Sequence, residues 1–189
     1  MKDTRQKNQR LAFLGLLTAI TFIMIYTPLG TISIGPVSIT IAHIPVLIAT
    51  IMFGLKDGLI MGLIFGLTTM SKALISPMGI LDPLFQNPLV SVLPRLMIPV
   101  VTYAVYTLLA KANKTLRSLA AIIFGNLANT LFVGLALYFI VGNQLEAIIG
   151  QDALTVVLSI VSAAAVPETI GVSLIALPIV LRIKTKFKN

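Results

Sequence analysis

The chain has 189 residues, of which 57% are hydrophobic and 11% are charged, and its mean hydropathy is +1.01. These values exclude a soluble domain with a large core and predict an all-α integral membrane protein, with one transmembrane domain over residues 1–189. The net charge of +8 would suggest nucleic acid in a soluble protein. In so apolar a chain the basic residues are expected to set orientation in the bilayer, and no nucleic-acid partner is expected. Cysteine is absent, which excludes disulfides, thiolate metal sites and cysteine nucleophiles.

Hydropathy predicts six transmembrane helices, each near the length that a bilayer requires. The first follows a basic stretch at residues 1–10 and could alternatively be read as a signal peptide, but no small-residue cleavage site follows it. A tight turn is expected at residues 56–58, and the sixth span is expected to be interrupted at Pro167 and Glu168. The spans cover approximately residues 11–28, 39–55, 59–76, 88–110, 118–141 and 153–181.

The distribution of positive charge predicts the orientation of these spans. Every Lys and Arg except Lys72 and Arg95 lies in the termini or in the turns at 56–58 and 111–117. These segments share one side of a six-span arrangement, so the positive-inside rule predicts a multi-pass cell-membrane protein with both termini cytoplasmic. The loops expected to face outward are residues 29–38, 77–87 and 142–152.

Small residues spaced four apart mark two helix faces. Gly58, Gly62 and Gly66 lie on one face of the third span, where another helix can approach closely. Gly15 and Ala19 have the same spacing on the first span, which is otherwise a smooth apolar helix. The first set predicts packing between helices.

Residues 81–95 form a polar segment that contains three prolines. Proline donates no backbone hydrogen bond and disfavours helix at the residue before it, so carbonyls and amide side chains are left free. Such backbone is tolerated at membrane depth only against protein or a cavity. The segment is therefore predicted to be a binding element, in which Gln86, Asn87 and Arg95 are candidate ligand contacts.

Arg95 and Lys72 are the cations within the spans, where a charge costs about 2.5–3.5 kcal/mol and usually pairs or lines a wet cavity. The planar fork of Arg95 suits bidentate capture of a carboxylate or phosphate, and the alternative is a structural ion pair with Asp82 or Glu168. Lys72 lies near the end of its span, where it can instead snorkel to the interface. Glu168 follows a proline at depth and is a candidate to pair with Arg95 or to accept from a ligand hydroxyl.

Three uncharged or weakly basic side chains complete the predicted substrate-binding set. Asn126 and Asn129 share a helical face that suits a polar ligand, and hydrogen bonding between helices is the equal alternative. His43 is a further candidate, although a buried structural histidine is the commoner case. No second histidine is present to complete a metal site, so no metal is expected.

Recognisable catalytic motifs are absent. The sequence has no G-x-x-x-x-G-K-[ST] phosphate loop, no G-x-S-x-G elbow, no H-E-x-x-H and no paired carboxylates at catalytic spacing. We therefore expect no enzyme activity and no ATP hydrolysis by this chain, so uphill transport would need a partner or an ion gradient. A stand-alone secondary transporter is the weaker reading, because no internal repeat or titratable relay is visible.

The six short spans, the polar outer half and the pair Gly15 and Ala19 resemble the substrate-binding S components of energy-coupling factor (ECF) vitamin transporters. Residues 81–95 look most like the pantothenate-type members, with hydroxymethylpyrimidine-type members as close relatives. The resemblance implies high-affinity capture of a vitamin from outside, under a roof formed by the loop at 29–38. It implies docking through Gly15 and Ala19 on a module of one transmembrane coupling subunit and two ATPases. ATP would then be used by these partners, and no cofactor is expected on this chain.

Charge within the spans favours pantothenate among the vitamins considered. Lys72 and Arg95 outnumber the single deep acid Glu168, and a dry cavity would leave that surplus uncompensated. The carboxylate of pantothenate would compensate it, whereas hydroxymethylpyrimidine is neutral. The surplus vanishes if Asp82 folds onto either cation, and the sequence does not place that side chain.

Overall fold

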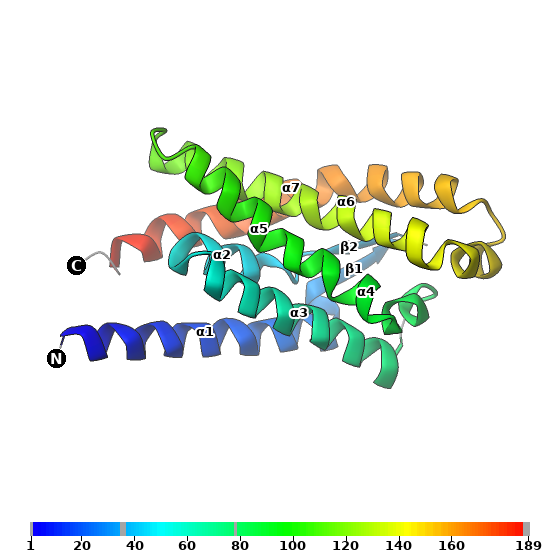
Figure 1. The fold of residues 1–189 in the computed structure, drawn as a ribbon, viewed down its shortest axis with the longest axis horizontal. Helices are drawn as coiled ribbons and strands as arrows, with labels where there is room; N and C mark the ends of the chain where they lie inside the picture. Colours follow the sequence, from blue (N-terminus) through cyan, green and yellow to red (C-terminus); the bar gives the residue numbers. More distant parts are fainter. Residues whose placement is uncertain (1, 35–36, 78, 187–189) are drawn as a thin grey trace.

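The computed structural model describes residues 2–34, 37–77 and 79–186. Residues 35 and 36 of the predicted roof and Lys188 of the basic C-terminus lie outside these ranges. The chain forms an elongated helical bundle with a two-stranded hairpin on one side (Figure 1). In order, the elements are α1 (Lys2–Tyr26), the 3-10 helix η1 (Pro28–Gly30), β1 (Thr31–Ile34), β2 (Val37–Thr40), α2 (Ile44–Phe53), α3 (Leu55–Ile75), the 3-10 helix η2 (Asp82–Gln86), α4 (Pro88–Ser91), α5 (Leu93–Leu108), α6 (Lys114–Ile149) and α7 (Ala153–Lys186).

The prediction of a helical membrane protein is confirmed. Among the described residues, five helical stretches are long and apolar enough to cross a bilayer: α1, α3, α4 with α5, α6 and α7. A sixth apolar helix, α2, has 10 residues and is too short to cross a bilayer alone.

The second predicted span, at residues 39–55, is only partly helical. Its beginning belongs to β2, which pairs antiparallel with β1 so that Thr31 lies opposite Thr40. Pro45 lies in the first turn of α2, and Gly54, at φ 96°, separates α2 from α3. Glycine adopts this left-handed backbone without steric cost, so the break falls at Gly54 rather than in the predicted turn at 56–58, which is the first turn of α3.

Other helix boundaries also differ from the predicted ones. The fourth span is divided at Val92, between α4 and α5. The fifth continues as α6 through a non-helical residue, Val141, to Ile149, so most of the outer loop expected at 142–152 is helical. Pro167 lies inside α7 without interrupting it, because neighbouring helices support a membrane helix that lacks one backbone hydrogen bond.

The glycine face of α3 packs against the break between α4 and α5, as predicted. A Cβ atom at Gly62 would lie 2.6 Å from the backbone oxygen of Arg95, and one at Gly66 would lie 2.8 Å from the Cα of Val92. Both distances are too short for any side chain other than hydrogen. These glycines therefore bring α3 against the backbone that carries Arg95.

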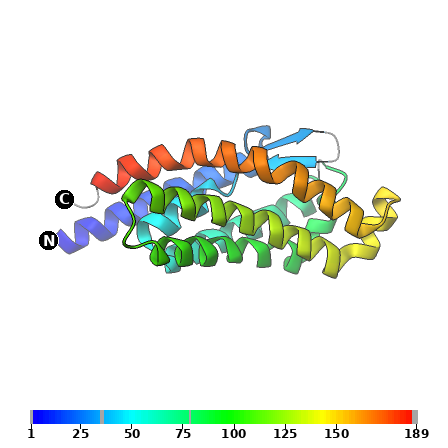
Figure 2. The same ribbon diagram turned by 90° about the horizontal axis from the view of Figure 1, so that it is seen from above.

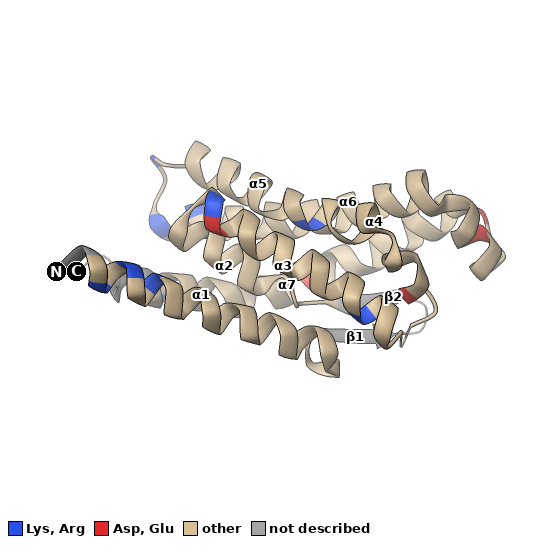
Figure 3. Cartoon of the chain, turned by 60° about the horizontal axis from the view of Figure 1, so that its bottom comes forward, with Lys and Arg blue, Asp and Glu red and all other residues tan. Residues whose placement is uncertain are grey.

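Both ends of the chain lie at the same end of the bundle. Figure 3 shows most Lys and Arg residues toward the end of the bundle where α1 begins and α7 ends, whereas acidic residues lie at both ends. The hairpin lies beside α7, toward the less basic half of the molecule (Figure 2). The positive-inside rule predicts that the basic end is cytoplasmic and that the hairpin lies in the outward half.

Candidate binding site

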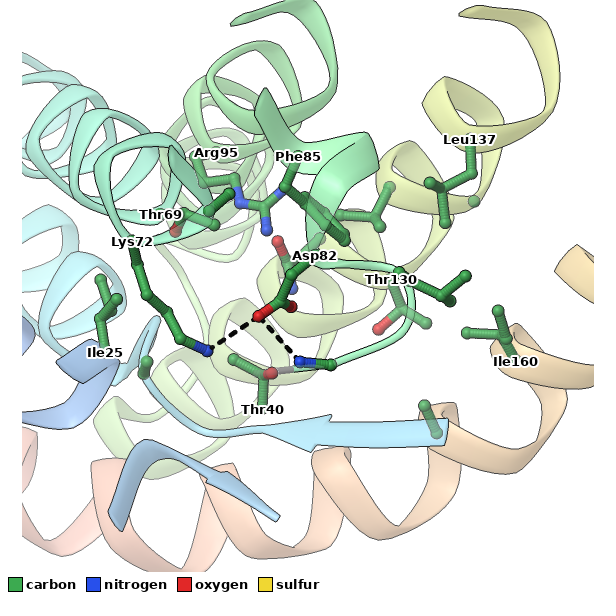
Figure 4. A pocket seen from close by; sticks show the side chains of 18 of the residues that line it. Ile25, Thr40, Thr69, Lys72, Asp82, Phe85, Arg95, Thr130, Leu137 and Ile160 are labelled. Carbon is green, nitrogen blue, oxygen red and sulfur yellow. Dashed lines mark hydrogen bonds and ion pairs between the residues drawn. The ribbon is translucent and has the colours of Figure 1, made fainter. Parts of the chain in front are cut away.

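A cavity of about 320 Å³ lies between the hairpin, α3, η2 and the helices α5, α6 and α7 (Figure 4). Its volume is in the range of small-molecule sites, which begin at about 300 Å³. Much of its wall is apolar, and the polar groups come from separate elements that converge on it. Its charged and polar lining residues are Thr40, Thr69, Lys72, Asp82, Arg95, Asn129, Thr130 and Glu168.

Arg95 is held at the cavity wall by the proline that precedes it. Pro94 has no N–H to donate to the carbonyl of Val90, four residues earlier. Arg95 Nη1 donates to this Val90 oxygen at 2.9 Å. The residue is 6% exposed, and its buried Nε has no hydrogen-bond partner among the described residues. The guanidinium is therefore anchored at one nitrogen, while its Nε is a donor without an acceptor in the described part of the chain.

Lys72 and Asp82 form an ion pair at the cavity, with Nζ 3.5 Å from Oδ2 (Figure 4). The same Asp82 oxygen accepts from the backbone N–H of Gly79 at 3.1 Å. Asp82 thus folds onto one of the two cations of the spans. The lining cations Lys72 and Arg95 are balanced by Asp82 and Glu168, so the charge surplus expected from the sequence is not present in this cavity.

Glu168 connects the hairpin to the helices. Its Oε1 accepts from the backbone N–H of Thr40 at 2.6 Å, at the end of β2, and its Oε2 accepts from the Thr130 hydroxyl at 3.1 Å. In the described part of the chain, the ion pairs within 4.0 Å are those of Arg10 with Asp57 and Lys72 with Asp82. The predicted alternative in which Arg95 pairs with Glu168 or Asp82 is therefore not observed.

The two predicted asparagines of α6 have different surroundings. Asn129 lines the cavity, and its buried Oδ1 has no hydrogen-bond partner among the described residues. Asn126 does not line the cavity, and its Nδ2 donates to Thr169 on α7 at 2.8 Å, which links two helices. His43 is fully buried at the start of α2 and also lies outside the cavity lining.

Gln86 and Asn87 lie beside the cavity without lining it. Gln86 Nε2 donates to the backbone oxygen of Ala73 at 3.1 Å, which ties η2 to α3. Asn87 is the N-cap of α4, where its Oδ1 accepts from the N–H of Leu89 at 2.9 Å. The structure thus gathers Lys72, Arg95, Asn129 and Glu168 at one cavity, and the other four predicted residues lie outside its lining.

Sequence reasoning misses several lining residues, among them Thr130, Phe65 and Phe85. Thr130 follows Asn129 and lies one turn after Asn126, so helical periodicity was a usable signal for it. Phe65 and Phe85 carry no polar group, and nothing in their local sequence distinguishes them from lipid-facing aromatic residues.

Residues 9–180 match the sequence profile of the family described as "ECF transporter, substrate-specific component". The chain belongs to this family. S components of this kind are multi-pass membrane proteins that bind substrate for transport and are not enzymes, and they work with an ECF module. The fold agrees, because a solved structure titled "Structure and mechanism of the S component of a bacterial ECF transporter" superposes with a TM-score of 0.68 at 20% identity. This superposition covers 97% of the present S component and 99% of that chain.

A curated relative gives a narrower similarity. Over 73 residues the S component is 36% identical to "Pantothenate transporter PanT" of Leuconostoc mesenteroides subsp. mesenteroides. The aligned region is 39% of this chain and spans about a third of the relative, 35% of its length.

The predicted docking residues of the S component lie on an open face of α1. Gly15 and Ala19 are both exposed, and a Cβ atom at Gly15 would meet nothing within 4 Å. Large apolar side chains around them are exposed too, including Leu16 at 55% and Ile23 at 54%. Neither small residue therefore serves to pack α1 against the described part of this chain.

Proposed function

We propose that this S component binds pantothenate from the outer side and supplies it to an ECF module of one transmembrane coupling subunit and two ATPases, which drives its uptake with ATP. The observation that carries the proposal is Arg95. It is a buried guanidinium at the wall of a ligand-sized cavity, and no carboxylate of the described chain pairs with it. A ligand carboxylate would supply the missing acceptor in a geometry that the guanidinium fork favours.

The neighbouring polar groups match the rest of such a ligand. Pantothenate has two hydroxyls and an amide besides its carboxylate. Asn129 presents an unpartnered Oδ1 that accepts from a hydroxyl or amide N–H, and the Thr69 hydroxyl also lines the cavity. The local similarity to a pantothenate transporter supports the same ligand.

The balanced charge of the lining supports a second candidate, hydroxymethylpyrimidine. Two cations face two carboxylates, so a neutral ligand requires no compensating charge. In that case Asp82 or Glu168 would accept from the exocyclic amine, and Arg95 would serve only to offset the acids. The two candidates therefore differ in whether Arg95 contacts a ligand carboxylate.

Calorimetric titration of the purified chain in detergent distinguishes them; the sequence has no tryptophan to report binding by fluorescence. Wild type and Arg95→Ala would each be titrated with pantothenate and with pantothenol, its neutral alcohol analogue. We expect wild type to bind pantothenate far more tightly than pantothenol, and Arg95→Ala to lose most of that difference. Tight pantothenol binding by wild type, or an unaffected Arg95→Ala variant, would instead favour the pyrimidine.

Uptake requires a separate test. In vesicles that contain the S component with a complete ECF module, pantothenate uptake should require hydrolysable ATP. Uptake by the S component alone, driven by an ion gradient, would contradict the proposal and support a secondary transporter.

A further inference from the structure

The guanidinium of Arg95 lies over two aromatic rings that belong to different elements. Its central carbon is 5.4 Å from the ring centroid of Phe65 on α3 and 5.1 Å from that of Phe85 on η2. Both distances are within the range of cation–π attraction, about 6 Å. Figure 4 shows Phe85 beside Arg95 at the upper wall of the cavity.

The two rings are held in place in different ways, Phe65 by close packing of helices and Phe85 by hydrogen bonds of the segment that carries it. Phe65 lies on α3 between Gly62 and Gly66, the two glycines that allow α3 to touch the backbone around Arg95. Phe65 is 2% exposed, so its ring is fixed by packing.

Phe85 lies on η2, which hydrogen bonds hold to its surroundings. Its backbone oxygen accepts from the hydroxyl of Ser91 on α4. On either side of it, Gln86 donates to Ala73 of α3 and Asp82 pairs with Lys72 of the same helix. These contacts fix the position of Phe85 relative to α3 and α4. Arg95 contacts the same two helices, through Gly62 of α3 and the Val90 oxygen of α4.

An aromatic face and a carboxylate stabilise a buried cation in different ways. A protein carboxylate would neutralise Arg95 and occupy the in-plane donors of its fork. A ring attracts the cation through its quadrupole, leaves the net charge in place and accepts no hydrogen bond in the guanidinium plane. Arg95 has aromatic partners, so its charge remains available to a ligand, as does its Nε, which no acceptor among the described residues contacts.

We infer that Phe65 and Phe85 are positioning residues that orient Arg95 for an anionic ligand without neutralising its charge, and that they determine selectivity for a carboxylate over its neutral analogue. The inference rests on the proposed function, since it requires that Arg95 contacts the ligand carboxylate. Phe85 is the better position to test, because it is only partly buried and lines the cavity.

The test compares pantothenate with pantothenol on the full chain in detergent. Phe85→Leu should weaken pantothenate binding about five- to thirty-fold more than it weakens pantothenol binding, the ratio that corresponds to a desolvated cation–π contact. Phe85→Tyr, which keeps the ring face, should restore pantothenate binding. In the Arg95→Ala background, Phe85→Leu should weaken pantothenate no further than pantothenol.

Ile160→Ala is the matched control. Ile160 is an apolar lining residue on the opposite side of the cavity from Arg95 (Figure 4). Its truncation should therefore change the affinities for pantothenate and pantothenol by the same factor. If Phe85→Leu behaves like this control, or changes neither ligand, the positioning role is wrong. If Arg95→Ala itself leaves pantothenate binding unchanged, the proposed ligand fails as well. Loss of binding in Arg95→Ala without an effect of Phe85→Leu would overturn only the present inference.

Discussion

Arg10 and Asp57 form a bidentate ion pair that ties α1 to the first turn of α3. Arg10 Nε lies 2.6 Å from Asp57 Oδ2, and Nη2 lies 2.5 Å from Oδ1. The two side chains differ in exposure, 44% for Arg10 and 3% for Asp57. Removing Arg10 would therefore leave a nearly buried carboxylate without its cation.

The magnitude follows from this asymmetry. Removing one partner of a fully buried pair costs about 3–5 kcal/mol, whereas exposed pairs contribute about 0–1 kcal/mol. Because water reaches Arg10 but hardly reaches Asp57, we expect Arg10→Ala to lower the free energy of unfolding by about 1–3 kcal/mol. The double variant Arg10→Ala/Asp57→Asn should recover much of this loss, since no unpaired carboxylate remains.

Thermal unfolding in detergent measures the effect, with Arg5→Ala as the control because Arg5 is an exposed cation on the same helix. Ligand affinity should stay near wild type, since neither Arg10 nor Asp57 lines the cavity. If Arg10→Ala melts at the same temperature as Arg5→Ala, the pair does not stabilise the fold and the reasoning from burial is refuted.

Four further predictions concern docking, packing, ligand contact and helix capping. Ala19→Phe should leave ligand affinity intact and abolish ATP-dependent uptake, and equal loss of both would show that Ala19 only supports the bundle. Gly62→Val should destabilise the chain by about 1–3 kcal/mol, because its Cβ meets the Arg95 oxygen at 2.6 Å; an unchanged melting temperature would contradict that contact. Asn129→Ala should weaken ligand binding by about 1–3 kcal/mol. Asn87→Ala should instead lower stability by about 1 kcal/mol through the lost cap, and a larger effect of Asn87 on direct binding would reverse this assignment.

Local features of the sequence correctly predict much of this protein. Composition alone establishes the membrane class, because a chain this apolar exposes many hydrophobic side chains, which lipid accommodates and water does not. Of the polar side chains predicted at depth, Lys72, Arg95, Asn129 and Glu168 line one cavity, and their contact with a ligand stays a prediction. The role of Asn87 was also accessible, since an asparagine before a proline is a typical helix start.

The partner of each polar group is decided only by the tertiary structure. Pro94 predicts that the Val90 carbonyl is free, but only the fold shows that Arg95 takes it. Likewise, the sequence allowed Asp82 to pair with either Lys72 or Arg95, and the structure shows that it pairs with Lys72. This ion pair removes the surplus of positive charge that had favoured an anionic ligand.

The hairpin and the short helix α2 also depend on tertiary contacts. Residues 39–55 are apolar enough for a span, yet β2 occupies their beginning because β1 pairs with it and Glu168, far away in sequence, accepts from Thr40. Hydropathy and helix breaking act within a few residues of the chain, so the sequence by itself determines the class, the approximate spans and the candidate polar groups. Hydrogen bonds and ion pairs depend on distances of a few ångströms between elements that are remote in sequence, and these distances exist only once the helices have packed.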